Sequence, residues 1–371
     1  MDVGTSSIKA VVLDGAIISD SARAPLPTPH STSDLQKAFV DVFESLLPEE
    51  RRGQVRALCI GGRAPTLVGI RGDQQDGPVV GWEGSPAKAT RGRFYLDSIA
   101  KSLMEHDRDL YDSCRFFVNP HEYLTYLLTG LVRSSTPSDL YHPWGGYVTE
   151  AKRRLKSARV DNSKVAPPVP VGSVVGTISP ALAPSLGLEE TAIVVMGGWD
   201  FFLDILGSAI SIPGEILVRA GTSIAVDALW SSPLDFDDFF TTPYFMSGIY
   251  VVGNVLRSAA EFTGREEHPL RSAGQKASGP EDDAKEIADA VSRLRQRMGD
   301  PLSIVCSGQR ALSTDICRRL ISMIGRSVQR PGEPDTEARG AAMLASVTSG
   351  VTATYEEHIR AIKSTWETIA G

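Results

Sequence analysis

Apolar strand-like runs alternate with helical patterns along most of the chain, and this alternation limits the fold more than any other feature. Runs rich in β-branched residues and bounded by turn residues predict strands, and apolar residues at helical spacing predict helices between them. The predicted strands cover residues 9–14, 55–62, 77–82, 190–198, 215–221, 248–253 and 302–308, and the predicted helices cover residues 35–47, 90–106, 121–128, 201–207, 282–298, 314–325 and 336–350. This order predicts an α/β protein.

The length of the chain predicts more than one domain. Its 371 residues correspond to about two domains, or to one large one. Hydrophobic residues make up 42% and charged residues 22%, a mixture that can bury a sizeable core and that argues against a disordered, collagen-like or coiled-coil protein. A proline cluster at 167–170 predicts a rigid connection before the strand at 190. We therefore expect domains at residues 1–195 and 196–371.

Charge, hydropathy and cysteine content exclude several classes of protein. The net charge is −7 and no basic patch dominates, so we expect no nucleic-acid partner. The apolar runs, such as 193–196, are too short for a membrane span, and the N-terminus lacks a leader pattern, so we expect a cytoplasmic protein. The four cysteines, which lack the spacing of a metal or redox pair, are expected to be buried thiols: Cys59, Cys114, Cys306 and Cys317.

The first motif that suits a chemical role is the turn Gly4-Thr5-Ser6, between a strand end and the run at 9–14. In such a turn, backbone N–H groups and hydroxyls can approach phosphate oxygens. Lys9 adds a positive charge, and Asp2 can hold a metal ion through water. A simple hairpin turn explains the same string.

The second motif is Gly197-Gly198-Trp199-Asp200, where the strand at 190–198 gives way to an apolar helix. A carboxylate at a strand's carboxyl end faces the crevice where α/β proteins bind ligands. Asp200 is thus a candidate to accept the proton of a substrate hydroxyl during phosphoryl transfer. A helix N-cap is the alternative. Asp204, one turn later on the same face, is either a second acidic group or an exposed position, and we expect it to be exposed.

Two further groups of small residues follow. One is a second Gly-Thr-Ser turn, Gly221-Thr222-Ser223, and the stretches 2–14 and 219–229 are faintly similar, through a duplicated core or by chance. The other combines Ser307-Gly308-Gln309 with Gly340, where small residues let a flat ligand such as adenine lie against backbone. Ordinary close packing is the alternative at each place.

Taken in order, these motifs resemble those of the FGGY carbohydrate kinases, members of the sugar kinase, actin and Hsp70 superfamily. Segments between the motifs resemble the family too: residues 120–130, 172–188, 205–223 and 325–331. The resemblance implies two RNase H-like (actin-like ATPase) domains, each with a mixed sheet flanked by helices, and an active-site cleft between them. Family members are often dimers, so a homodimer is the assembly it suggests.

The resemblance also implies a reaction, the ATP- and Mg²⁺-dependent phosphorylation of a hydroxyl on a small sugar, polyol or sugar acid. In this assignment Asp200 is the general base and Asp2 helps to hold Mg²⁺. The implied nucleotide-binding residues are Gly4, Thr5, Ser6, Lys9, Gly221, Thr222, Ser223, Ser307, Gly308, Gln309 and Gly340.

The expected sugar site departs from the family pattern. Arg63 stands where many relatives have a glutamine-led segment, and Trp82 and Glu83 begin a segment that has lost the family's polar partners. Trp199 replaces a small or polar residue beside the base. Two tryptophans suit stacking on a sugar face, and Arg63 suits either an anionic substrate or an exposed strand end.

These departures keep two other functions open. One is a nucleotide-binding regulatory or scaffold protein that has lost phosphoryl transfer, for which the altered sugar site and a shortened second domain argue. The other is an actin-like ATPase acting on a partner, against which the Leu-Thr-Gly segment and the segment before Asp200 argue.

Overall fold

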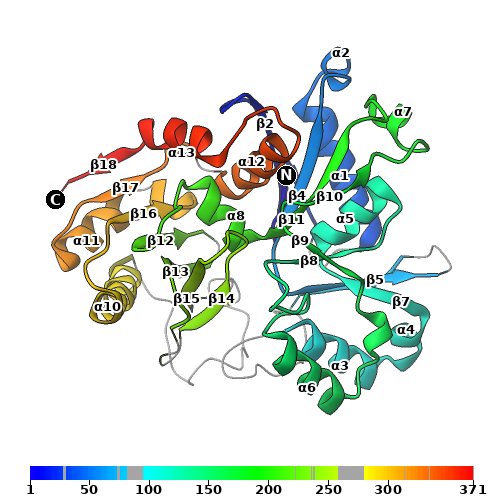
Figure 1. Cartoon of the computed structure of the whole chain (residues 1–371), viewed down its shortest axis with the longest axis horizontal. Coiled ribbons are helices and arrows are strands. Elements are labelled where there is room, and N and C mark those ends of the chain that lie inside the picture. The colour runs from blue at the N-terminus through cyan, green and yellow to red at the C-terminus, as the bar shows by residue number, and fades with distance from the viewer. Residues whose placement is uncertain are drawn as a thin grey trace. The chain divides into compact units, whose positions relative to one another are not determined.

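A computed structural model describes residues 1–27, 31–72, 76–81, 95–221, 223–234, 236, 239–257, 280–312, 314–333 and 335–370. The chain forms two units (Figure 1). Unit 1 is Met1–Leu203 with Glu337–Glu357, and unit 2 is Asp204–Thr336 with His358–Gly371. The chain changes units within helix α8 (Asp200–Gly207), after the first residue of helix α12 (Thr336–Thr348) and within helix α13 (Tyr355–Ser364). The predicted domain boundary near residue 195 stays a prediction.

The main sheet of unit 1 has six strands in the order β10-β11-β4-β1-β2-β3. Strands β1, β2 and β3 form an antiparallel meander, β1, β4 and β11 run parallel, and β10 is antiparallel to β11. The strands are β1 (Asp2–Val3), β2 (Ser7–Asp14), β3 (Ile17–Pro25), β4 (Ala57–Gly62), β10 (Val174–Thr177) and β11 (Ile193–Trp199).

Helices α1 (Thr32–Leu46) and α5 (Pro120–Thr129) pack side by side on this sheet, and local sequence fixes where each one begins or ends (Figure 1). Helix α1 starts with a capping box, in which Ser31 and Asp34 exchange side-chain-to-backbone hydrogen bonds. Helix α5 has proline at its first position and ends at Gly130, whose φ of 73° suits a residue without Cβ.

Unit 1 also contains smaller elements. The strands β5 (Thr66–Arg71), β6 (Val79–Gly81) and β7 (Cys114–Val118) form a sheet of order β6-β5-β7, and β8 (Ser134–Thr136) pairs with β9 (Pro168–Pro170). The remaining helices are α2 (Glu49–Arg52), α3 (Leu96–His106), α4 (Arg108–Ser113), α6 (Val148–Ala158), α7 (Ala183–Leu186) and the short 3₁₀ helix η2 (Asn162–Lys164).

Unit 2 is built on a seven-stranded sheet of order β14-β15-β13-β12-β16-β17-β18. Its strands are β12 (Glu215–Ala220), β13 (Ile224–Trp230), β14 (Phe240–Pro243), β15 (Tyr250–Arg257), β16 (Ser303–Ser307), β17 (Val328–Arg330) and β18 (Glu367–Ile369). Helices α10 (Pro280–Met298) and α11 (Thr314–Ile324) pack against each other, and α13 (Tyr355–Ser364) and the 3₁₀ helix η3 (Gln309–Leu312) complete the described elements.

The two sheets repeat one topology. From β18 to β15, neighbouring strands of unit 2 are antiparallel, parallel, parallel, antiparallel and antiparallel, and unit 1 shows the same succession from β10 to β3. The two Gly-Thr-Ser segments occupy equivalent positions, between β1 and β2 and between β12 and β13. The faint internal similarity in the sequence therefore falls at equivalent places in the two sheets, as a duplicated core would require.

Each main sheet has its own apolar core. In unit 1 the core gathers buried side chains of the sheet and of α1, including Val3, Ile60 and Phe43. In unit 2 it gathers residues of the sheet with α10 and α11. All four cysteines are buried thiols, as predicted. Across the described ranges, the structure contains no helix with both the length and the hydropathy to cross a bilayer.

Candidate active site

The carboxyl ends of three parallel strands meet at one edge of the main sheet in unit 1. Strand β4 lies between β1 and β11, and all three point the same way. The chain leaves these ends at Gly4, Arg63 and Asp200. Ligands of α/β proteins bind outside such strand ends. The structure thus brings three of the predicted site segments to one edge.

The first Gly-Thr-Ser turn is a tight hairpin connection. The N–H of Gly4 donates a hydrogen bond of 3.0 Å to the carbonyl oxygen of Ser7, and a Cβ on residue 4 would lie 3.2 Å from that oxygen. Thr5 Oγ1 accepts a hydrogen bond from Nη1 of Arg63 at 3.4 Å, and Ser6 is exposed. The hairpin is confirmed, and its contact with phosphate stays a prediction.

Charged side chains gather beside this turn. Nζ of Lys9 lies 3.4 Å from Oε2 of Glu337 and 4.0 Å from Oδ2 of Asp2. Asp2 is buried, and its Oδ1 has no hydrogen-bond partner among the described residues. Burial, and then the charge of Glu337, raise the pKa of the Asp2 carboxyl well above its usual range. Lys9 opposes this rise in pKa, and Asp200 adds to it.

The raised pKa of Asp2 means that a further cation beside this cluster would favour its ionised form. Mg²⁺ is commonly held by one or two carboxylates together with phosphate oxygens and water. Asp2 fits that role because it presents a buried oxygen that needs a partner. Over the described part of the chain, no group of three or more His, Cys, Asp or Glu side chains is arranged to hold a metal ion.

Glu337 belongs to this cluster, and sequence reasoning did not select it. Its side chain is 23% exposed and pairs with Lys9 across 328 positions of sequence. Locally, Glu337 looks like an ordinary acidic residue in the first turn of α12, where the helix dipole favours negative charge. Its position three residues before Gly340 was the only available signal.

Asp200 is the first residue of α8 and directly follows β11. It is partly exposed, and its Oδ1 accepts a hydrogen bond from the N–H of Phe201 at 2.8 Å. Because α8 starts here, its N-terminal end also stabilises the negative charge. The structure therefore places Asp200 at the helix start, as both interpretations of this residue require, and its catalytic role stays a prediction.

An aromatic cluster surrounds Trp199, the residue before Asp200. The Trp199 ring stacks on Phe202, with centroids 5.6 Å apart and planes at 5°, and meets the edge of Tyr141 at 5.8 Å. Its Nε1 is buried and has no hydrogen-bond partner among the described residues. An indole held in this way gives the strand edge a rigid, mainly apolar side. Trp82 and Glu83 lie outside the described residues.

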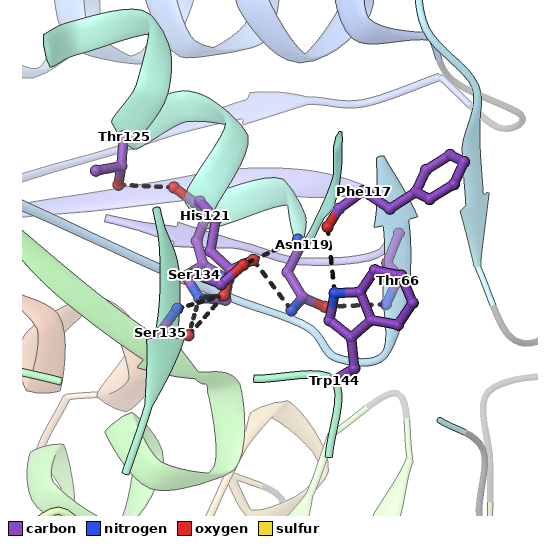
Figure 2. Close-up of polar contacts among 9 residues, drawn as sticks. Thr66, Phe117, Asn119, His121, Thr125, Ser134, Ser135 and Trp144 are labelled. Atoms are coloured by element: carbon purple, nitrogen blue, oxygen red, sulfur yellow. Dashed lines mark hydrogen bonds and ion pairs between the residues drawn. The ribbon is translucent and has the colours of Figure 1, made fainter. Parts of the chain in front are cut away.

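A buried polar network lies behind the same edge (Figure 2). The carboxylate of Glu122 accepts hydrogen bonds from the backbone N–H groups of Asn119 and Ser135, both at 2.7 Å, and from the hydroxyls of Ser134 and Ser135. His121 Nε2 lies 3.0 Å from Ser135 Oγ. Burial lowers the pKa of His121 to about 3, so the imidazole is neutral at physiological pH.

The first turn of α5, which carries His121, packs against the strand ends. A Cβ on Gly62 would lie 3.1 Å from Cβ of Val3 and 3.5 Å from Cβ of His121. The end of β4 is therefore packed between β1 and the first turn of α5, with little space to shift.

In unit 2, the second Gly-Thr-Ser turn and the predicted adenosine turn touch each other. Strands β12 and β16 are parallel, with Arg219 beside Ser307. Gly308 has a φ of +90°, and a Cβ there would lie 2.7 Å from the carbonyl carbon of Ala220 and 2.9 Å from the nitrogen of Gly221. Glycine is required at this contact, both for its backbone angle and for its size.

The other predicted residues of these turns are placed as follows. The Gly221 N–H donates to the carbonyl oxygen of Ser223 at 3.0 Å, Thr222 lies outside the described residues, and Gln309 begins η3. Gly340 lies in α12, where a Cβ would come within 2.0 Å of the Leu203 carbonyl oxygen. Close helix packing accounts for Gly340, and its contact with adenosine stays a prediction.

The prediction that Asp204 is exposed is wrong, because this carboxylate is only 2% exposed. Its Oδ1 accepts hydrogen bonds from Thr336 Oγ1 at 2.6 Å and Ser208 Oγ at 3.0 Å, and its Oδ2 accepts one from Ser307 Oγ at 2.9 Å. A carboxylate can be buried when donors replace the water it loses. These hydroxyls supply that replacement, and two of them come from distant parts of the sequence.

Comparison with known proteins identifies the fold. No protein-family model matches the chain. A stretch of 130 residues is 26% identical to a ribulokinase of Anoxybacillus flavithermus, covering 33% of this chain and 23% of that protein. The chain therefore matches less than a quarter of the length of this curated relative.

Two solved structures are similar over nearly the whole chain. A ligand-bound xylulose kinase from Lactobacillus acidophilus has a TM-score of 0.81 at 14% identity, covering 100% of this chain and 92% of that one. A glycerol kinase from Plasmodium falciparum with ADP has a TM-score of 0.80 at 12% identity, covering 99% and 92%. The predicted fold class, mixed sheets flanked by helices as in the actin-like ATPases, is confirmed.

Proposed function

Since this chain has the fold of the FGGY carbohydrate kinases, we propose that it transfers the terminal phosphoryl group of ATP to a hydroxyl of a small sugar, polyol or sugar acid. The relatives and neighbours named above are kinases of ribulose, xylulose and glycerol, and the glycerol kinase structure contains ADP. They support this class of reaction without selecting the acceptor.

One observation carries the proposal: Lys9 Nζ lies 4.0 Å from Oδ2 of the buried Asp2 beside the Gly4–Ser6 turn, and Asp200 follows β11 at the same edge of the sheet. Phosphoryl transfer needs a proton acceptor, positive charge toward the phosphates and a metal ligand. Asp200, Lys9 and Asp2 supply these three groups at one strand edge.

In the proposed reaction, Asp200 takes the proton from the acceptor hydroxyl. The hydroxyl oxygen bonds to the terminal phosphorus of ATP, and the bond between that phosphorus and the bridging oxygen breaks, so ADP leaves. Lys9, held between Asp2 and Glu337, directs its ammonium group toward the phosphates. Asp2 would hold Mg²⁺, which would neutralise phosphate charge. Gly4, Thr5 and Ser6 offer backbone N–H groups and hydroxyls to the phosphate oxygens.

The acceptor would lie against Trp199, whose stacked ring offers an apolar face to the carbon side of a polyol or sugar. Arg63 follows the end of β4 and reaches Thr5, so it suits an acceptor with a carboxylate as well as a phosphate oxygen. We include Trp82 and Glu83 in the proposed substrate site from the family resemblance alone.

The nucleotide would be held by the two turns of unit 2. We assign its phosphates to Gly221, Thr222 and Ser223, and its adenosine to the turn beginning at Ser307. Gln309 and Gly340 complete the proposed nucleotide-binding set. From the resemblance we also propose a cytoplasmic homodimer.

The test is a screen for ADP release with Mg-ATP against polyols, ketoses, aldoses and sugar acids. We expect one compound to stimulate release, and Asp200→Asn to abolish that stimulation while leaving the thermal unfolding curve unchanged. Stabilisation by ATP with no stimulated release by any compound would overturn the proposal. That result would favour a nucleotide-binding regulatory or scaffold protein.

A further inference from the structure

We propose that Asp204 is a positioning residue for nucleotide binding, because its buried carboxylate fixes the Ser307–Gly308 turn against the Ala220–Gly221 backbone. The inference rests on the proposed function, which assigns both turns to the nucleotide. It adds a residue that does not itself contact the nucleotide but sets the spacing between the two turns that do.

The hydrogen bonds of Asp204 join three segments of unit 2. Ser208 directly follows α8, Ser307 ends β16 and Thr336 begins α12. Ser307 and Thr336 lie 103 and 132 positions away in sequence, and both are almost fully buried. One carboxylate therefore locates the ends of two distant elements at the same point.

The bond to Ser307 controls the position of the turn that follows. Gly308 comes directly after Ser307, and its Cα already lies against the Ala220–Gly221 backbone so closely that a Cβ would stand 2.7 Å from Ala220. A shift of Ser307 would either make Gly308 clash with the Ala220–Gly221 backbone or move it away from that backbone. The distance between the adenosine turn and the phosphate turn thus depends on the Ser307 hydroxyl.

A charged acceptor suits this task better than apolar packing. Hydrogen bonds to an ionised carboxylate are shorter and about twice as strong as neutral ones, and they are directional. A hydroxyl that donates to such an acceptor has one favoured position, whereas apolar contacts tolerate small displacements. Asparagine has nearly the same shape, but it replaces one acceptor oxygen with an NH₂ donor, so Asp204→Asn tests the charge with little change in volume.

The experiment measures the dissociation constant of ADP in the presence of Mg²⁺, by calorimetry on the full chain. Three variants are compared: Asp204→Asn, Ser307→Ala, and Ser208→Ala as the matched control, which removes a hydrogen bond from the same carboxylate without touching the turn. We expect the first two to weaken ADP binding about tenfold, the effect of losing one hydrogen bond to a charged group. Ser208→Ala should bind ADP as the wild type does.

A double variant separates positioning from general damage. If Asp204 acts through Ser307, Asp204→Asn with Ser307→Ala should bind ADP no more weakly than either single variant. Wild-type affinity in Asp204→Asn, or equal losses in Ser208→Ala and Ser307→Ala, would overturn the inference. If Asp204→Asn fails to fold, wild-type affinity in Ser307→Ala would overturn it alone.

The same measurements keep this inference distinct from the proposed function. A protein that binds ADP in the expected order of variants, yet phosphorylates no acceptor, would sustain the role of Asp204 and overturn the kinase activity. A kinase in which Asp204→Asn leaves both the ADP affinity and the KM for ATP unchanged would sustain the proposed activity and overturn the role of Asp204. A wild-type protein that does not bind ADP would overturn both.

Discussion

In unit 1 the hairpin β1–β2 carries an acid on its first strand and a base on its second, whereas the equivalent hairpin β12–β13 of unit 2 carries them in the opposite order. In unit 1, Lys9 Nζ stands 4.0 Å from Asp2 Oδ2. In unit 2, Arg219 Nε lies 2.6 Å from Asp227 Oδ2. Both acids are buried and both bases are mostly buried.

The surroundings of the two pairs explain the difference in distance. Asp227 packs against Gly253, where an added Cβ would lie 2.2 Å from Asp227 Oδ1. Burial raises the pKa of Asp227, and Arg219 opposes this rise. Asp2 shares its base with Glu337 and lies in the field of Asp200. The same topology thus holds a close ion pair in one unit and, in the other, a wider cluster of charged groups that we propose as part of the metal and phosphate site.

Of the substitutions that test this difference between the two units, we expect the largest effect from one in unit 1. Asp2→Asn should lower kcat about 100-fold, the usual scale for losing one charged group aimed at the transition state, and should raise the Mg²⁺ concentration needed for half-maximal rate. Thermal stability should not fall, since the change removes a buried charge beside other carboxylates. Steady-state rates across a Mg²⁺ titration measure this, and an unchanged Mg²⁺ requirement would remove Asp2 from the metal site.

The matched change in unit 2 should act on stability instead. Asp227→Asn removes the carboxylate that lies 2.6 Å from Arg219 Nε. Breaking a largely buried ion pair in this way costs about 3 kcal/mol of unfolding free energy. We expect kcat per folded molecule to stay at the wild-type value. Urea unfolding combined with rate measurements tests both parts, and a wild-type unfolding midpoint would show that the pair is not structural.

A smaller effect is expected on the pH dependence of the unfolding free energy, through His121 in unit 1. The pKa of His121 is about 3 in the folded protein, against an ordinary value near 6.5. Below pH 6.5 the His121 imidazole is protonated in the unfolded chain but stays neutral in the folded chain, so the unfolding free energy falls as the pH falls. Between pH 7 and 5.5 this loss is about 1 kcal/mol. The raised pKa values of Asp2 and Glu122 act in the opposite direction.

The comparison with His121→Gln isolates this effect, because Asp2 and Glu122 are present in both proteins. The variant should lose less stability than the wild type as the pH falls, by that same amount. Unfolding free energies at the two pH values give the answer. Parallel pH curves for the two proteins would show that the histidine takes up no proton on unfolding.

Local patterns were sufficient to predict most of this fold. The strand at β11 and the helix at α8 follow from a buried β-branched run, two glycines and an apolar helical repeat, so the position of Asp200 between them was predictable. Both Gly-Thr-Ser turns were recognised as connections between strands. The sequence only suggested that the two turns belong to a repeated topology, because strand pairing depends on contacts between segments far apart in the sequence.

The parts that local patterns could not supply depend on long-range contacts. Asp204 looks like an exposed helical residue until Ser307 and Thr336 are brought to it from more than 100 positions away. Glu337 looks like a helix-start acid until Lys9 lies beside it. In both cases the environment of the carboxylate, and not its neighbours in sequence, decides its role.

The most direct test of the account compares Asp200→Asn with Asp204→Asn, two carboxylates one helical turn apart in α8. Initial rates are measured with Mg-ATP and the acceptor identified by the screen. We expect Asp200→Asn to lower kcat about 1000-fold, within the range for loss of a general base, with little change in the KM for ATP. Asp204→Asn should raise that KM about tenfold and keep most of kcat. A wild-type kcat in Asp200→Asn would contradict the assignment of Asp200 as the base.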